Sequence, residues 1–220
     1  MDLKRMRSIY FNRNGLPGKN KQSGYTFVGQ VNDKDMARTP TKQIPLGFTA
    51  PHFKLPEPLT GKEVSLEQVQ GEKGTLVMFI CNHCPYVKHV MDELVAIGRE
   101  YMAKGIGMVA INSNDVDNYP EDHPDLMRDL ARQKQMPFPY LYDESQDVAR
   151  AYDAACTPDF NLFDRDGKCV YRGQLDGSRP GNEVPVNGVD LRRALDLVIL
   201  GEKVPEDQQP SIGCNIKWKN

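Results

Sequence analysis

The chain has 220 residues, 39% of them hydrophobic, and a formal net charge of −2. This length is enough for one well-buried domain with extensions and argues against a second full domain. Residues 1–35 hold seven basic residues and three aspartates, which leaves 21 basic and 27 acidic residues in the remainder. Because that remainder is acidic, the composition argues against nucleic-acid binding.

The cysteines are five in number and widely spaced, unlike the disulfide framework of a secreted protein. No apolar run is long enough to cross a membrane, and the first residues lack the apolar region of a secretory signal. We therefore expect a cytoplasmic protein that keeps its thiols mostly reduced and does not bind a membrane.

Three segments are expected along the chain. Residues 1–43 are expected to form a disordered or extra N-terminal extension, because glycine, asparagine and lysine recur in most of it without a helical or strand period. Met36 is a candidate start. Residues 44–201 are expected to form the folded domain, and residues 202–220 a C-terminal tail.

Within the domain, the pattern predicts a hairpin and then alternating strands and helices. The signals are a glycine turn between extended segments, unbroken apolar runs and apolar residues at helical spacing. The expected elements are a hairpin at 53–66, a strand at 75–81, a helix from Cys84 to Gly105, a strand at 107–112 and a helix at 124–135.

The second half of the domain continues this alternation. Ser145 is the expected N-cap of its first helix, and Gly201 ends its last. The expected elements are a strand at 138–142, a helix at 145–154, strands at 160–163 and 169–172 that form a hairpin, and a helix at 190–200.

Residues 81–89 read Cys-Asn-His-Cys-Pro-Tyr-Val-Lys-His and place two thiols three positions apart where a predicted strand meets a predicted helix. The thiolate is the reactive form of cysteine, and the N–H groups and dipole at a helix N-terminus lower the pKa of a thiol. The spacing predicts a redox pair in which Cys81 attacks and Cys84 resolves.

A Cys-x-x-Cys motif at a strand-to-helix junction, followed by a hairpin entered through Thr157-Pro158, resembles the thioredoxin fold over about residues 44–200. The leading hairpin and the helical insertion are similar to the redoxin branch, which includes TlpA/ResA and AhpC/TSA-like domains. The motif and residues 155–160 and 211–219 are similar to a group of largely uncharacterised bacterial thioredoxin-family proteins. The resemblance implies an α/β fold, with a central mixed β-sheet flanked by helices and an N-terminal β-hairpin.

The same resemblance implies an antioxidant or oxidoreductase role, in which a Cys81/Cys84 dithiol–disulfide couple exchanges disulfides. The expected partners are a protein or small-molecule disulfide and a thiol reductant, with no cofactor and no metal. Pro158 matches a cis-proline that lies opposite the motif, and Thr157 would offer its backbone to an extended substrate segment.

The residues around the two thiols depart from the patterns of the families that the motif resembles. His83 and its neighbour Asn82 are expected to tune the Cys81 thiolate, although Asn82 stands where DsbA-like oxidants have proline. Thioredoxins carry a buried aspartate where this chain has Thr75, and the ResA branch has a glutamate where it has Val87. The base for the resolving step is therefore unidentified in the sequence.

Two other chemistries remain open for the motif. In a peroxiredoxin-like thiol peroxidase Cys84 would be the peroxidatic residue, but the signature requires proline at Val77 and threonine at Cys81. A metal-binding protein could use Cys81, His83, Cys84 and His89, although the last two are five residues apart on a helix and share a face poorly.

Further thiols have competing interpretations. Cys156 lies two residues before Pro158 and is either an alternative disulfide partner or an inert core residue. Cys214 is either a remote resolving thiol or free, and Cys169 is expected to be structural.

Overall fold

The computed structural model describes residues 38–220, so residues 1–37 of the expected extension lie outside the described part. Residues 38–43 belong to the folded unit and begin with strand β1 (Arg38–Pro40). The expected extension is therefore too long at its C-terminal end.

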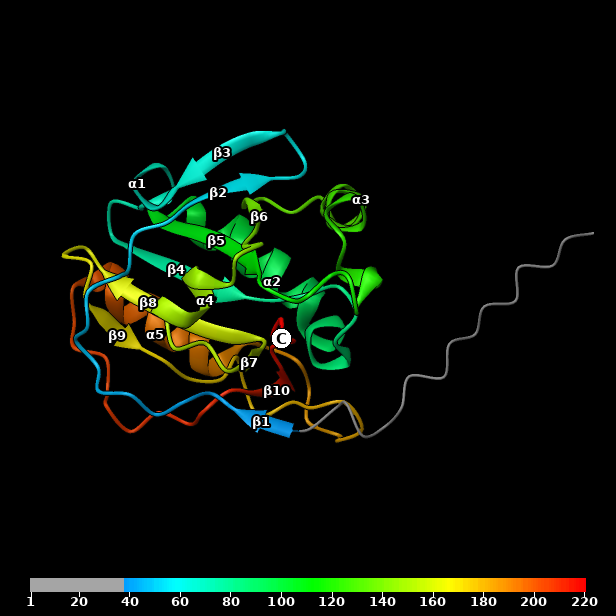
Figure 1. Ribbon diagram of the computed structural model, residues 1–220. Coiled ribbons are helices and arrows are strands. Elements are labelled where there is room, and N and C mark those ends of the chain that lie inside the picture. The colour runs from blue at the N-terminus through cyan, green and yellow to red at the C-terminus, as the bar shows by residue number, and fades with distance from the viewer. Residues whose placement is uncertain (1–37) are drawn as a thin grey trace, which may run out of the picture. The chain divides into compact units, whose positions relative to one another are not determined.

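A five-stranded mixed sheet forms the centre of the fold, in the order β6-β5-β4-β8-β9 (Figure 1). The first three strands of this order are parallel, and β8 and β9 join antiparallel. Its strands are β4 (Gly74–Phe79), β5 (Ile106–Asn112), β6 (Tyr140–Tyr142), β8 (Asp159–Asp164) and β9 (Cys169–Tyr171). The predicted strands and the mixed sheet are confirmed.

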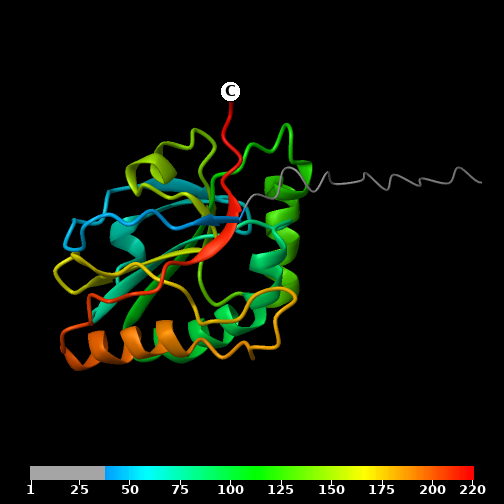
Figure 2. The ribbon, with the colours of Figure 1, turned by 90° about the horizontal axis from the view of Figure 1, so that it is seen from below.

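Alternate residues of β4 enter two apolar layers, one on each face of the sheet. Leu76 and Met78 pack with the long helices, whereas Val77 and Phe79 pack with the hairpin and the short helices. Figure 2 shows the last helix and the short helices on opposite sides. These elements are α2 (Pro85–Met102) and α5 (Val189–Leu200) on one face, and β2 (Lys54–Glu57), β3 (Lys62–Ser65), α1 (Leu66–Val69) and α4 (Asp147–Ala151) on the other.

The predicted hairpin is confirmed as the antiparallel pair β2–β3. After β5, the chain forms a short 3-10 turn, η2 (Pro120–Asp122), and then α3 (Pro124–Lys134). The N-cap of α4 is Gln146 and not Ser145; the hydroxyl of Ser145 accepts a hydrogen bond from the N–H of Asp147 instead. Within residues 38–220, no helix combines the length and apolar character that crossing a membrane requires.

A second, three-stranded sheet was not predicted from the sequence. It has the order β1-β10-β7, where β7 is Cys156–Thr157 and β10 is Ile212–Asn215. Both pairings are antiparallel, and Figure 2 shows β10 in red beside β1. The expected C-terminal tail therefore contains a strand that pairs with the folded domain.

Close backbone packing of β10 on β7 requires glycine at position 213, where an added Cβ would lie 1.9 Å from the carbonyl oxygen of Thr157. We expect Gly213→Ala to lower the free energy of unfolding by about 1–3 kcal/mol, because the strands must separate to admit the methyl group. Urea unfolding measures this. Gly177→Ala is the control, since its Cβ would meet Val184 at an ordinary 3.8 Å; equal losses in the two variants would contradict the packing argument.

Candidate active site

The Cys-Asn-His-Cys motif follows β4 and leads into α2. Cys84 is the N-cap of α2 and Pro85 its first residue. The helix N-terminus therefore acts most directly on Cys84, the thiol expected to resolve, and less directly on Cys81, the thiol expected to attack. Both cysteines are fully buried, with 0% exposure.

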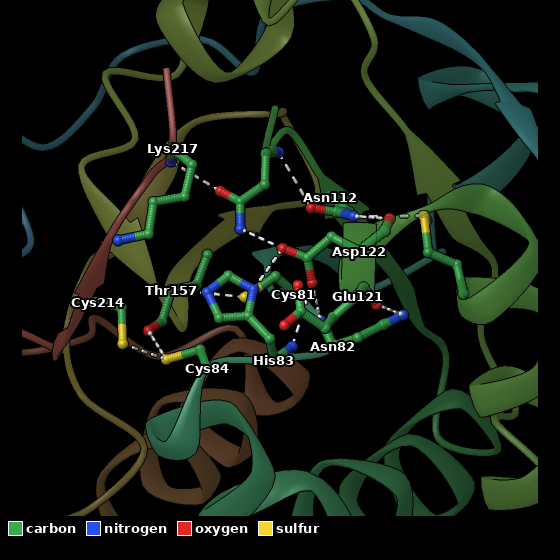
Figure 3. Close-up of polar contacts among 12 residues, drawn as sticks. Cys81, Asn82, His83, Cys84, Asn112, Glu121, Asp122, Thr157, Cys214 and Lys217 are labelled. Carbon is green, nitrogen blue, oxygen red and sulfur yellow. Dashed lines mark hydrogen bonds and ion pairs between the residues drawn. The ribbon is translucent and has the colours of Figure 1, made fainter. Parts of the chain in front are cut away.

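Three thiols, those of Cys81, Cys84 and Cys214, form a sulfur cluster (Figure 3). The Sγ atoms of Cys84 and Cys214 are 2.9 Å apart, and the Cys84 thiol donates to the carbonyl oxygen of Thr157 at 3.2 Å. Cys81 Sγ lies 3.3 Å from Thr157 Oγ1 and also interacts with Cys84. Cys84 is thus the central sulfur of the cluster.

The hydrogen bonds among the three thiols favour ionisation at Cys84. When Cys84 is a thiolate, hydrogen bonds from Cys214 and Cys81 stabilise it, and they lower the pKa of Cys84. Burial raises the pKa of Cys81 well above its usual range, and the hydrogen bond to Cys84 raises it further. The pKa of Cys214 is also raised, by its hydrogen bond to Cys84 and by burial.

We expect the reduced protein to retain one thiolate at pH values well below the ordinary thiol pKa of about 8.5, because the Cys84 pKa is lowered. The ultraviolet absorbance of the thiolate, followed as the pH falls from about 9, measures it. The acid-resistant absorbance should vanish in Cys84→Ser. It should survive in Cys169→Ser, since burial raises the pKa of that thiol in β9; its loss in both variants would contradict the assignment.

Asp122, at the end of η2, is a site residue that the sequence analysis did not identify. Its carboxyl is fully buried, and its Oδ1 accepts from the backbone N–H groups of Asn82 at 2.7 Å and His83 at 3.1 Å. Its Oδ2 accepts from Asn114 Nδ2 at 2.7 Å and lies 2.6 Å from His83 Nδ1. Since the other three partners donate hydrogens, an ionised carboxylate with a proton on Nδ1 best satisfies the group, leaving Nε2 available for proton exchange.

This acid–imidazole pair lies beside the first thiol of the motif. One ligand-capable atom each of Cys81, His83 and Asp122 lies within 4.8 Å of the others. The negative charge of Asp122 contributes to raising the pKa of Cys81, after burial and the hydrogen bond to Cys84. An imidazole that is oriented by a carboxylate and lies near a thiol is suited to proton transfer.

Asn82 fixes the loop between the two thiols. Its Nδ2 donates to the carbonyl oxygen of Glu121 at 3.0 Å, and its Oδ1 accepts from the hydroxyl of Tyr140 at 3.1 Å. The side chain thus ties the motif to η2 and β6. Its contacts position the motif and do not reach a sulfur atom.

The Thr157–Pro158 peptide is cis, as the resemblance implied. The same resemblance gives the backbone of Thr157 to a substrate segment, but in this structure Thr157 pairs with Cys214 of β10. The chain's own C-terminal strand occupies that edge.

Cys156 is buried and separate from the sulfur cluster in its hydrogen bonding. Its Sγ lies 3.7 Å from Thr41 Oγ1 and 3.5 Å from the carbonyl oxygen of Pro158. Burial raises the pKa of Cys156 above the usual thiol range. Its contacts favour the inert core interpretation, whereas Cys214 contacts Cys84 of the Cys-x-x-Cys motif directly.

The four residues considered for a metal do not converge. Among the described residues, Cys81 and His83 group with Asp122, and neither Cys84 nor His89 belongs to that group. His89 lies instead beside a small hollow that Pro158 also lines. Because Asp122 already engages four hydrogen-bond partners, the arrangement suits proton transfer better than a metal shell.

Comparison with known proteins identifies relatives of this chain. A family model described as Redoxin matches residues 45–189. A thiol-disulfide oxidoreductase ResA of Halalkalibacterium halodurans is 27% identical over 149 residues, covering 67% of this chain and 75% of that protein.

Solved structures are also similar to this chain. An uncharacterized conserved protein from Geobacillus kaustophilus is 58% identical, with a TM-score of 0.82 over 84% of this chain and 97% of that one. A putative thioredoxin from Neisseria meningitidis, at 24% identity and a TM-score of 0.53, covers 69% of this chain and 90% of its own and shows the thioredoxin-like fold alone.

Proposed function

The chain belongs to the redoxin family, and from that premise we propose that it is a thiol-disulfide oxidoreductase whose working pair is Cys81 and Cys84. The observation that carries the proposal is the position of these two thiols at the strand-to-helix junction, with both sulfur atoms within hydrogen-bond distance of Thr157 in the cis Thr157–Pro158 peptide. The proposed substrate is a disulfide in a protein or a small molecule, and the proposed reductant is a thiol. A cytoplasmic location is part of the proposal and rests on the cysteine content of the sequence.

The proposed reaction begins at Cys81. Because the pKa of this buried thiol is raised, attack requires a base, and His83 Nε2 accepts the proton while Asp122 holds the imidazole in the correct tautomer. The resulting Cys81 thiolate attacks one sulfur of the substrate disulfide. A mixed disulfide forms, and the other substrate sulfur leaves as a thiolate and takes a proton from His83.

The second step uses the lowered pKa of Cys84. Its thiolate attacks Cys81 Sγ, the Cys81–Cys84 bond forms, and the second substrate sulfur leaves with its electron pair. The substrate gains two electrons and the enzyme carries a disulfide, which a thiol reductant then reduces. Asp122 and His83 supply the proton chemistry for which the sequence showed no acid at Thr75 or Val87.

A redox titration tests the couple. The full chain is equilibrated in glutathione buffers of graded potential and alkylated, and each cysteine is then quantified by mass spectrometry. We expect Cys84 to lose alkylation reversibly as the buffer becomes more oxidising, together with Cys81 or, where Cys214 displaces Cys81, with Cys214, while Cys169 stays alkylated after unfolding. If neither Cys81 nor Cys84 forms a disulfide at any potential, the proposal is wrong.

Peroxide reduction is the second candidate function, and the helix N-terminal position of Cys84 with its lowered pKa favours it. In that reaction the Cys84 thiolate attacks one oxygen of hydrogen peroxide, the O–O bond breaks, and the other oxygen leaves as hydroxide and is protonated to water. A second thiol then condenses with the sulfenic acid and releases a second water. The two candidates separate in one variant. Cys81→Ser should abolish disulfide exchange but preserve consumption of hydrogen peroxide if Cys84 is the peroxidatic residue.

A further inference from the structure

Cys214 lies where a third thiol can join the disulfide exchange. Its Sγ is 2.9 Å from Cys84 Sγ, so a movement of about 0.9 Å brings the two sulfur atoms to bonding distance. The side chain is 1% exposed and faces the redox motif from a strand that no local sequence pattern marks. The proximity links segments 130 positions apart in the chain.

The backbone holds these two sulfur atoms in place. In β10, Cys214 is paired with Thr157 on one side and with Arg38 of β1 on the other. The carbonyl oxygen of Thr157 also accepts from the Cys84 thiol, so one residue fixes both partners. The pairing of β10 with β1 and β7 therefore fixes the position of Cys214 next to Cys84.

The end of the chain is tied to the same loop that carries the acid. The N–H of Lys217 donates to Asn114 Oδ1 at 2.9 Å, and the carbonyl oxygen of Lys217 accepts from the N–H of Asp115 at 2.8 Å. The side-chain amide of Asn114 in turn donates to Asp122. One hydrogen-bond chain thus joins the residues after β10 to the His83–Asp122 pair, as Figure 3 shows in part.

We propose that Cys214 is a third redox thiol, which displaces Cys81 from the Cys81–Cys84 disulfide and leaves the oxidised enzyme with a Cys84–Cys214 disulfide. This proposal rests on the proposed function, since it needs the first disulfide to form. It assigns the resting oxidised state to a pair that the Cys-x-x-Cys spacing does not indicate.

The step balances within the chain. The Cys214 thiolate attacks Cys84 Sγ, the Cys84–Cys214 bond forms and the Cys81–Cys84 bond breaks. The electron pair leaves on Cys81, which takes up the proton that Cys214 released. No oxidant is consumed; the substrate's two electrons now come from Cys84 and Cys214, and a thiol reductant reduces that disulfide.

Moving the disulfide has two consequences. Cys81 returns to the thiol form while the enzyme is still oxidised, and β10 becomes covalently linked to the start of α2. The edge of Thr157 that β10 occupies then stays closed until a reductant acts.

A single-turnover experiment on the full chain tests the third thiol. Reduced protein reacts with one equivalent of the model disulfide 5,5′-dithiobis(2-nitrobenzoic acid), is quenched in acid and alkylated, and its disulfides are mapped by mass spectrometry without reduction. In the unaltered chain we expect a peptide pair joining Cys84 to Cys214 and an alkylated Cys81. In Cys214→Ser this pair should be lost completely and replaced by Cys81–Cys84.

Controls separate the two proposals. Cys169→Ser, which removes a buried thiol in β9, should give the same map as the unaltered chain, and Cys214→Ala with a melting curve checks that the strand still folds. A Cys81–Cys84 disulfide with Cys214 alkylated in the unaltered chain would overturn the third thiol and leave the proposed function standing. If the reagent produces no disulfide at Cys84 in any form of the protein, both proposals fail.

Discussion

Cys81→Ser is expected to lower the rate of disulfide reduction by at least about a thousandfold. Cys84→Ser is expected to trap a mixed disulfide at Cys81. The first change removes the sulfur that attacks the substrate, and a hydroxyl cannot form a disulfide. The second change leaves the attacking sulfur in place but removes the thiolate that lies next to it and completes the reaction. The two variants should therefore fail at different steps.

The measurement is the reduction of insulin with a thiol reductant, together with non-reducing mass spectrometry of each variant after one addition of substrate. Cys156→Ser is a matched control, since that thiol is equally buried and bonds to Thr41 and Pro158 outside the sulfur cluster. We expect it to keep nearly full activity. If Cys81→Ser traps substrate as well as Cys84→Ser does, the assignment of the attacking sulfur is wrong.

Cys214 can complicate the trapping result, and its effect has a defined direction. Cys214 Sγ lies 2.9 Å from Cys84 Sγ, and Cys84 is the central sulfur of the cluster, so Cys214 should resolve a mixed disulfide at Cys81 poorly when Cys84 is absent. The double variant Cys84→Ser/Cys214→Ser should trap about as much substrate as Cys84→Ser alone. A large gain in the double variant would mean that Cys214 attacks Cys81 directly.

The core of the fold was predictable because its signals are local. The strand β4 is an unbroken apolar run because both of its faces are buried, and α2 has apolar residues at helical spacing because one of its faces is buried. The mixed order of the sheet came from the resemblance carried by the motif and Pro158. These parts of the fold could therefore be predicted from the sequence.

The strand β10 was not predictable in this way. It reads Ile-Gly-Cys-Asn, with a glycine inside a four-residue strand and no alternation of apolar and polar residues. Its conformation comes from pairing with β1 and β7, segments far away in the sequence. A local pattern carries no information on such pairing, so the residues after 201 were expected to form a tail.

Asp122 was missed for a related reason. It stands among several acids in a loop, and nothing in its neighbours separates a buried carboxylate from exposed ones such as Asp117. One topological signal was available: the loop follows β5, which is parallel to β4, so both strands end at the same edge of the sheet. Acids in that loop were therefore candidates for contact with a motif that follows β4.

Asp122→Asn is expected to lower the rate of disulfide reduction by about a hundredfold near neutral pH, which is the rate contribution that a general acid–base group typically makes. The carboxylate accepts from His83 Nδ1 and so leaves Nε2 without a proton. An amide nitrogen turned toward His83 reverses the tautomer and places the proton on Nε2, which then cannot take a proton from Cys81. The histidine remains in place but is in the wrong protonation form.

The pH dependence separates this role from a structural one. Removing the Asp122 charge removes one of the causes that raise the pKa of Cys81, so the alkylation midpoint of Cys81 should move to lower pH even as the reduction rate falls. A variant that only loosened the loop would change the rate without that shift. His83→Gln should lose a similar factor, and the double variant should lose little more, because the two residues act as one unit.

Asp117→Asn is the matched control, because it removes an exposed carboxylate from the same loop, and it should leave both the rate and the Cys81 midpoint unchanged. Full activity in Asp122→Asn, or an unchanged midpoint with a reduced rate, would contradict the proton-transfer role. The rate and the Cys81 midpoint have to be measured together, because a buried thiol with a raised pKa is a poor nucleophile by itself. Cys81 can attack first only if the His83–Asp122 pair removes its proton, so the identity of the attacking sulfur and the role of the acid depend on each other.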